Sequence, residues 1–163
     1  MRVLGVDPGI AIAGYGIVDH AGNSFSPVDY GSLRSSADMP SHLRLRKLFS
    51  ELTSLIDKYH PQCMAVEQLF FNRNVRTAMS VSQARGVILL AAALADLAVY
   101  EYTPLQVKQA VAGRGRAEKQ QVQFMIKIIL NLPAIPKPDD VADALAVAVC
   151  HVNNFSNLAL TKT

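Results

Sequence analysis

Residues 2–20, RVLGVDPGIAIAGYGIVDH, carry the pattern that decides the fold. An apolar run over residues 2–7 ends on Asp7 and predicts a buried strand. The turn Asp-Pro-Gly follows, and residues 13–20 then alternate small or polar with apolar side chains, as a second strand would. A short turn leads to a third strand around residues 28–33. Together these segments predict an antiparallel meander.

The hydrophobic pattern changes after the third strand. Residues 41–59 place apolar side chains on one helical face, whereas residues 63–68 form a short apolar run that contains Glu67 near its end. Residues 98–102 predict a fifth strand. Further helices are expected over 77–97, from Thr103-Pro104 to Gly113, over 117–131 and over 139–153. A meander followed by helices that alternate with two more strands predicts an α/β fold, with a five-stranded mixed sheet flanked by helices on both faces.

The composition suits one globular domain. The chain has 163 residues, of which 50% are hydrophobic and 18% are charged, so a sizeable core is expected. We expect a single domain over residues 1–155 and a flexible C-terminal tail over residues 156–163. Cys63 and Cys150 lie in apolar runs and predict buried free thiols, which suit a reducing, cytoplasmic location. No stretch resembles a signal peptide, and the apolar segment 87–97 is shorter than the roughly 20 residues that cross a bilayer.

Charge is distributed unevenly along the chain. The net charge of +3 is a mild excess and by itself weak evidence for nucleic-acid binding. Basic residues gather in groups, while several acids lie in apolar-flanked positions elsewhere, so the chain could hold metal and polyanion together. The basic groups are Arg34, Arg44, Arg46 and Lys47; Arg73, Arg76 and Arg85; and Lys108, Arg114, Arg116 and Lys119.

Four carboxylates are candidate metal ligands. Asp7 ends the first strand and Glu67 the fourth, and side chains at such strand ends point into the crevice where α/β proteins bind ligands. Asp140 and Asp143 are three residues apart and share one face of the last, otherwise apolar helix. Acids in such a place are costly unless they are paired or bound to a cation. Hard oxygen ligands suit Mg²⁺ or Mn²⁺, and a pair of such ions can promote cleavage of a phosphodiester.

Each acid also has a simpler structural interpretation. Asp7 before Pro-Gly is typical of a turn residue, and Asp140 is typical of the acids that favour a helix start. Helical spacing from Asp143 permits either Asp139 or Asp140 as its partner. Asp143 is the hardest to explain structurally, because it lies deeper in the apolar helix. Taken jointly, the four acids favour a metal site.

Five blocks of sequence resemble one family. The blocks are GVDPGIAIAGYG at 5–16, AVEQLFFNRN at 65–74, SQARGVILLAAA at 82–93, YTPLQVKQAVAGRGRAEKQQV at 102–122 and DDVADALAVAVCH at 139–151. In this order and at this length they resemble RuvC, the bacterial Holliday-junction resolvase family of the RNase H-like superfamily. The resemblance covers nearly the whole chain.

The resemblance implies a structure-specific endonuclease that resolves four-way DNA junctions during recombination and repair. The family cuts paired strands of like polarity and leaves 5′-phosphate nicks. Its four catalytic acids, which are also its metal ligands, fall on Asp7, Glu67, Asp140 and Asp143. Two Mg²⁺ ions per active site are expected, with Mn²⁺ able to substitute. The family also implies a homodimer, in which the 77–97 helix contributes to the interface, and a branch-migration complex of RuvA and RuvB as partner.

The expected DNA contacts come from a loop after Glu67 and from basic residues later in the chain. The family's junction-centre aromatic falls on Phe70, although the adjacent Phe71 could share or exchange that role by stacking on unpaired bases. A basic glycine-containing loop before a helix start suits phosphate, although it could also be an ordinary solvated loop. The expected DNA-binding residues are Phe70, Phe71, Arg73, Lys108, Arg114, Arg116 and Lys119.

Three other functions are compatible with parts of the pattern. The first block also resembles a phosphate loop of actin-like ATPases, but those folds need a second similar domain, which 163 residues do not provide. A junction-binding module that does not cut is disfavoured by the complete acid set. A nuclease for RNA or RNA/DNA hybrids is disfavoured by the loop aromatics.

Overall fold

The protein folds as an α/β domain, seen in a computed structural model that describes residues 1–68 and 75–160. The strands are β1 (Arg2–Asp7), β2 (Ile12–Ala21), β3 (Ser24–Arg34), β4 (Cys63–Glu67) and β5 (Ala98–Tyr102). The helices are α1 (Ser41–Tyr59), α2 (Val75–Leu94), α3 (Pro104–Ala112), α4 (Lys119–Ile129) and α5 (Asp139–Leu160). No helix within the described ranges is long and apolar enough to cross a membrane.

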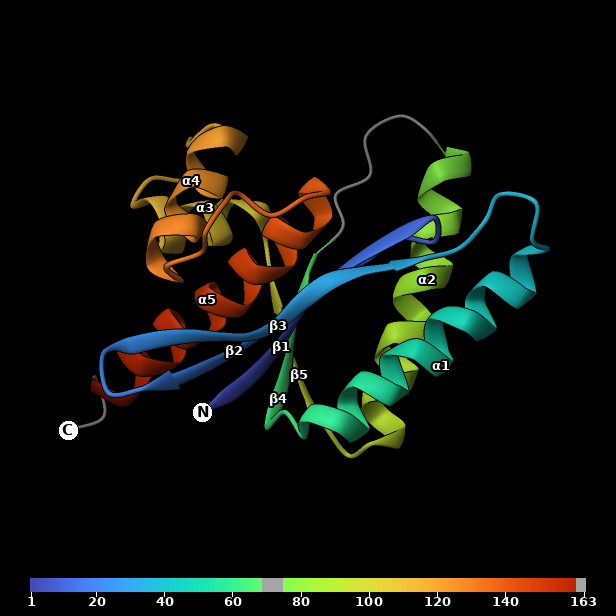
Figure 1. Ribbon diagram of the computed structural model, residues 1–163, viewed down its shortest axis with the longest axis horizontal. Coiled ribbons are helices and arrows are strands. Elements are labelled where there is room, and N and C mark those ends of the chain that lie inside the picture. The colour runs from blue at the N-terminus through green and yellow to red at the C-terminus, as the bar shows by residue number, and fades with distance from the viewer. Residues whose placement is uncertain (69–74, 161–163) are drawn as a thin grey trace.

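The strands form one mixed sheet in the order β3-β2-β1-β4-β5. The meander β1-β2-β3 is antiparallel, and β4 and β5 join β1 in parallel. Figure 1 shows α1 and α2 on one face and α3, α4 and α5 on the other. The predicted fold class, a five-stranded mixed sheet flanked by helices on both faces, is therefore confirmed.

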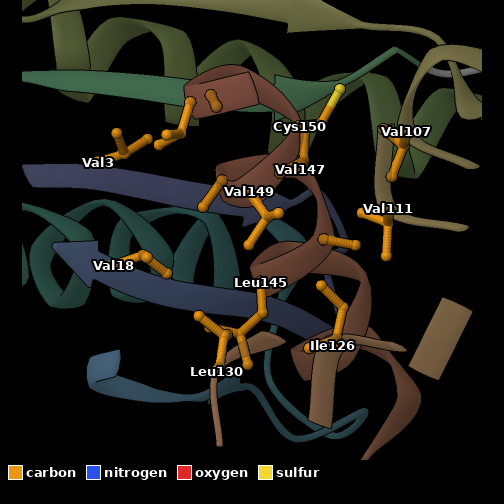
Figure 2. Packing of buried hydrophobic residues seen from close by; sticks show 14 of the residues in the cluster. Val3, Val18, Val107, Val111, Ile126, Leu130, Leu145, Val147, Val149 and Cys150 are labelled. Carbon is orange, nitrogen blue, oxygen red and sulfur yellow. The ribbon is translucent and has the colours of Figure 1, made fainter. Parts of the chain in front are cut away.

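Alternating side chains of the sheet build two hydrophobic cores. On β1, Val3 packs towards α5 (Figure 2), whereas Leu4 and Val6 pack towards α1 and α2. The strand β4 repeats this pattern, with Cys63 and Ala65 on the α5 side. Because side chains alternate along a strand, the terminal acid of each strand also belongs to the α5 side. The alternation thus decides which helix the two strand-end acids face.

Glycines let α5 lie directly on the sheet. A Cβ built on Gly5 would come within 2.1 Å of the Ala144 carbonyl oxygen, and one on Gly14 within 1.9 Å of the Asp140 carbonyl oxygen. On Gly16 it would come within 2.5 Å of a Leu145 methyl carbon. These separations are far below van der Waals contact. At Gly5 and Gly14 the obstacle is the α5 backbone, so only glycine fits there, whereas a larger residue at Gly16 would require the Leu145 side chain to move.

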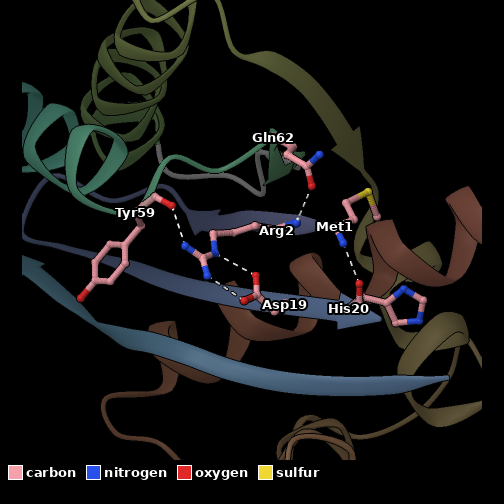
Figure 3. A network of polar contacts seen from close by, with 6 residues as sticks. All are labelled: Met1, Arg2, Asp19, His20, Tyr59 and Gln62. Atoms are coloured by element: carbon pink, nitrogen blue, oxygen red, sulfur yellow. Dashed lines mark hydrogen bonds and ion pairs between the residues drawn. The ribbon is translucent and has the colours of Figure 1, made fainter. Parts of the chain in front are cut away.

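A polar network secures the end of the sheet remote from the strand-end acids (Figure 3). The Arg2 guanidinium donates to both carboxylate oxygens of Asp19, at 2.8 and 2.7 Å, and to the Tyr59 carbonyl oxygen at 2.8 Å. The terminal amine of Met1 donates to the His20 carbonyl oxygen at 2.6 Å. The network therefore joins β1 and β2 to the end of α1.

Two elements are longer than the sequence predicts. The third strand begins at Ser24 because β2 pairs with it as far as Ala21↔Ser24, and its Pro27 is tolerated on an edge strand. The last helix continues beyond residue 153 to Leu160. Asn153 donates to the Ala110 carbonyl oxygen and Asn154 to the Cys150 carbonyl oxygen, so these polar residues support the helix that they were expected to end.

Gly14→Ala should destabilise the protein by about 1–3 kcal/mol, as overpacked cores do, because its methyl group would overlap α5. Gly86→Ala is the matched control, since a Cβ there meets nothing within 4 Å and alanine favours a helix. Urea unfolding measures both variants. Equal stability of the two variants would contradict the close packing of α5.

Candidate active site

The carboxyl ends of β1 and β4 place two acids side by side. The two strands are parallel neighbours, with Val6 opposite Val66, so Asp7 and Glu67 follow at matching positions. Both acids share the α5 face of the sheet, as the alternation requires. The first and fourth strands are thus neighbours, which is the condition for the two carboxylates to converge.

The first turns of α5 bring two further acids to the same place. The Asp140 backbone rests on Gly14, which pairs with Asp7 across β1 and β2. Burial raises the pKa of Asp7 to about 8, with further contributions from the charges of the other three predicted ligands. Burial, and then Asp143, raise the pKa of Glu67 to about 7. The pKa of Asp143 is also raised, first by burial.

Asp139 and Asp140 have different surroundings. The Asp139 carboxylate accepts from Lys137 at 2.8 Å, and this contact lowers its pKa below the ordinary value. Its side chain is 45% exposed. Asp140 instead contributes to the raised pKa of Asp7. The geometry therefore associates Asp140 with the strand-end acids and Asp139 with the surface.

Lys119 faces the acids from the start of α4. Its ammonium lies 2.9 Å from Asp143 Oδ2 and 3.6 Å from Asp139 Oδ2. Burial alone would lower the pKa of Lys119, but the hydrogen bond to Asp143 and the nearby carboxylates outweigh it and raise the pKa. The sequence places this lysine directly after Glu118, whose backbone N–H donates to Gln121 Oε1 at 3.1 Å where the helix begins.

A cavity of about 210 Å³ opens beside the acids and is bounded by β4, α3, α4 and α5. Its lining brings Lys108 and Lys119 together with two of the acids. The positive charges of both lysines oppose the rise in the pKa of Glu67. The lining residues are Glu67, Pro104, Val107, Lys108, Lys119, Val122, Asp143 and Ala146.

Other predicted site residues lie apart from this cavity or beyond the described chain. Arg114 lines a separate cavity of about 340 Å³ next to Phe124, and Arg116 belongs to the same loop before α4. The structure brings neither arginine to the acids. Phe70, Phe71 and Arg73 lie outside the described residues.

His151 on α5 belongs to the core. Its ring is 1% exposed, and its nitrogens lie 2.8 Å from the Tyr102 hydroxyl and 3.2 Å from Cys63 Sγ. Burial lowers its pKa, which favours the neutral ring. Cys63 and Cys150 are buried free thiols, as predicted. His151 therefore ties α5 to β4 and β5.

The chemistry of the acid group fits a hard divalent cation. All four side chains offer carboxylate oxygens, the ligands that such ions prefer. Burial and neighbouring carboxylates raise the pKa of Asp7 and of Glu67, so a bound cation would stabilise their ionised forms. Among residues 1–68 and 75–160, no three acidic, histidine or cysteine side chains enclose a ready-made ion site. The four acids therefore interact through their charges and do not form a ready-made ion site. One carboxylate oxygen of Asp143 accepts a hydrogen bond from the Lys119 ammonium.

A mixed five-stranded sheet with acids on its first and fourth strands and on the last helix defines a nuclease of the RNase H-like class. The comparisons narrow the class further. The family model described as "Crossover junction endodeoxyribonuclease RuvC" matches residues 3–151. The chain therefore belongs to the RuvC family of crossover junction endodeoxyribonucleases, which are metal-dependent enzymes.

Individual relatives agree with this family. The RuvC of Desulforamulus reducens is 60% identical over 151 residues, which are 93% of each chain. The structure of Thermus thermophilus RuvC superposes with a TM-score of 0.89 at 35% identity, covering 98% of this chain and 97% of that one. Thermus thermophilus RuvC in complex with Holliday junction substrate gives the same TM-score at 34% identity, with 96% of each chain covered. The family match favours the nuclease over the ATPase that the first block also resembles.

Sequence reasoning missed how the acids meet. It grouped Asp7 with the α5 acids by chemistry, but the close approach depends on Gly5, Gly14 and Gly16. The signal was present, because small residues recur at alternating positions of β1 and β2 and again on α5 as Ala144 and Ala148.

Asp7→Asn should raise the thermal unfolding midpoint at pH 8–9, because an ionised carboxylate there is buried among like charges. Folding raises the pKa of Asp7 from about 4 to about 8. Protonated Asp7 therefore contributes fully to the free energy of unfolding below about pH 4, and this contribution is lost as the pH rises through about 8. The gain of the variant should therefore vanish near pH 4. Asp57→Asn, at an exposed site on α1, should show no such pH-dependent gain in a calorimetric scan.

Proposed function

We propose that this chain resolves four-way DNA junctions with one carboxylate site, made of Asp7, Glu67, Asp140 and Asp143. The observation that carries the proposal is the meeting of β1, β4 and the start of α5, where Val6 lies opposite Val66 and the Asp140 backbone rests on Gly14. The raised pKa of Asp7, caused by burial and by the charges of the other three acids, supports it. Thermus thermophilus RuvC, which shares the fold over nearly the whole chain, is described in complex with Holliday junction substrate. The domain that does this work is proposed to span residues 1–155.

The four acids are proposed to hold two Mg²⁺ ions, with Mn²⁺ as a substitute. When bound, such a pair supplies an activated water and stabilises the departing 3′-oxygen, which leaves a 5′-phosphate on the cut strand. Asp7 and Glu67 must be ionised to bind a cation, and a cation would favour that ionisation because it replaces repulsion by attraction. Burial supports the site by limiting competition from water for the carboxylate oxygens.

Lys119 and Lys108 are proposed to bind the scissile phosphate. Lys119 carries its charge beside Asp143, and Lys108 lines the same cavity, so a phosphate entering that cavity meets two ammonium groups as well as the acids. Arg114 and Arg116 are proposed to contact the backbone farther along the strand. Phe70, Phe71 and Arg73 remain proposed contacts at the junction centre, on the family resemblance alone.

The proposed enzyme is a homodimer that pairs through α2. Three large apolar side chains on this helix remain outside the core: Met79 is 62% exposed, Leu90 53% and Leu94 68%. They recur at intervals of 11 and four residues, which keeps them near one helical face. Two copies would place two active sites on one junction, as paired nicks require. RuvA and RuvB are the proposed partners of this dimer, and the bacterial cytoplasm, where chromosomal junctions form, is its proposed location.

Asp140→Asn should lower nicking of a synthetic four-way junction by several orders of magnitude, with junction binding retained. Asp139→Asn is the matched control and should stay within about tenfold of wild type, because Asp139 pairs with Lys137 at the surface. A radiolabelled junction in Mg²⁺ measures both rates, with linear duplex as the specificity control. Loss of nicking in the Asp139 variant alone would reassign the ligand, and full activity in both would remove α5 from the site.

Leu94→Glu should convert the proposed dimer to monomer, because it places a charge in an apolar contact. Leu105→Glu is the matched control, since Leu105 is 64% exposed on α3, away from α2. Sedimentation velocity at micromolar concentration distinguishes the two masses. A dimer that persists in both variants would place the interface elsewhere.

A further inference from the structure

Three basic residues cluster where β3 passes into α1: Arg34, Arg44 and Lys47, here named the β3–α1 basic cluster. The Lys47 ammonium donates to the Arg34 carbonyl oxygen at 2.5 Å, which joins the helix to the strand end. Arg34 is exposed, and Arg44 and Lys47 are partly so. The cluster lies outside the cavity that holds the acids, and the function described so far does not use it.

Hydrogen bonds tie this cluster to the turn that follows Asp7. Arg44 Nε donates to Ser35 Oγ at 2.8 Å, and Ser35 Oγ donates to the Ile10 carbonyl oxygen at 2.5 Å. The Ser35 backbone N–H donates to the Ala11 carbonyl oxygen at 3.1 Å. Figure 1 shows the β1–β2 turn and the β3–α1 loop at the same end of the sheet. The arginine is therefore positioned relative to the catalytic end by a fixed chain of contacts.

Arg34 also shares the face of the acids. It pairs with Ile12 across β2 and β3, while Asp7 pairs with Gly14 across β1 and β2. Ile12 and Gly14 are two residues apart, so the side chains of Arg34 and Asp7 belong to the same face of the sheet. Two strand spacings and two residues of rise separate the Cα atoms of Arg34 and Asp7 by roughly 12 Å.

Protein contacts leave the positive charge of this cluster largely unneutralised. Within the part of the chain that the structure describes, neither Arg34 nor Arg44 forms an ion pair; their Nε atoms donate to Ser32 and Ser35, which are neutral. Lys47 alone has an acidic partner, Glu51, at 3.4 Å. The first turn of α1 carries no acid, so positive side chains add to the positive end of a helix dipole.

We propose that the β3–α1 basic cluster binds backbone phosphates of the junction, on a strand that is not cut. The inference rests on the proposed junction cleavage. A separation of roughly 12 Å between the Cα atoms of Arg34 and Asp7 is about the width of the B-DNA major groove. A duplex arm with its scissile phosphate at the acids would therefore present the phosphates of the facing strand to the cluster. The guanidinium groups of Arg34 and Arg44 donate only to neutral serine oxygens. Their positive charge and remaining N–H groups are therefore available to bind a phosphate.

Arg34→Gln/Arg44→Gln tests the proposal, because glutamine keeps an amide donor for the serine contacts and removes the charge. Anisotropy of a labelled four-way junction, in EDTA so that no cutting occurs, gives Kd between 50 and 200 mM salt. We expect at least tenfold weaker binding and a salt slope smaller by about 0.9 for each phosphate that the variant no longer neutralises. Arg46→Gln/Lys58→Gln is the matched control; Arg46 lies two residues from Arg44 and so on another side of α1.

Single methylphosphonate linkages, placed along the strand that is not cut, locate the phosphates that the cluster binds. One neutral linkage should weaken wild-type binding and leave the Arg34→Gln/Arg44→Gln variant unaffected. Equal affinities and salt slopes for the two charge-loss variants would overturn the proposal, provided that urea unfolding finds both folded. A wild-type chain that fails to nick junctions would instead refute the proposed function.

Discussion

The direct contact of α5 with β1 and β2 is the constraint on which the rest of the structure depends. Side chains usually separate a helix from a sheet, but Gly5, Gly14 and Gly16 provide none. The α5 backbone occupies the space at Gly5 and Gly14, and the Leu145 side chain of α5 occupies it at Gly16. As a result, the acids at the start of α5 lie beside the end of β1. The same contact buries most of the helix, so that Asp143 is largely withdrawn from water along with Asp7.

This burial gives the site its electrostatic character. Like charges in a poorly solvated place raise the pKa of Asp7 and Glu67, so the folded chain is less stable with all of its acids ionised than with some of them protonated. Lys119 offsets part of that repulsion through Asp143. A site of this kind gains most from a bound cation, in line with the metal dependence of the family and with the general cost of function to stability.

The sequence predicted the fold class and grouped the four acids, because both depend on local patterns: alternation and helical period for the elements, and acids at strand ends for the site. It could not choose between Asp139 and Asp140, since a helical repeat tolerates either. In the structure Lys137 pairs with the Asp139 carboxylate at the surface, which favours Asp140 as the proposed ligand. Nor could it assign Arg34 and Arg44, because their relation to Asp7 arises only when β3 pairs with β2 and Ser35 meets the β1–β2 turn.

A site made of acids repels the polyanion that it cuts, so basic residues elsewhere in the protein must bind the DNA. A lysine close to the acids neutralises them as well as the substrate, as Lys119 does at Asp143. Charges farther from the acids interact with them more weakly, because the Coulomb energy falls with distance and salt screens it, and they still bind phosphate on contact. Arg34 and Arg44, with no carboxylate partner among the described residues, keep their charge for DNA. Binding and cutting can then be tuned by different residues of one small domain.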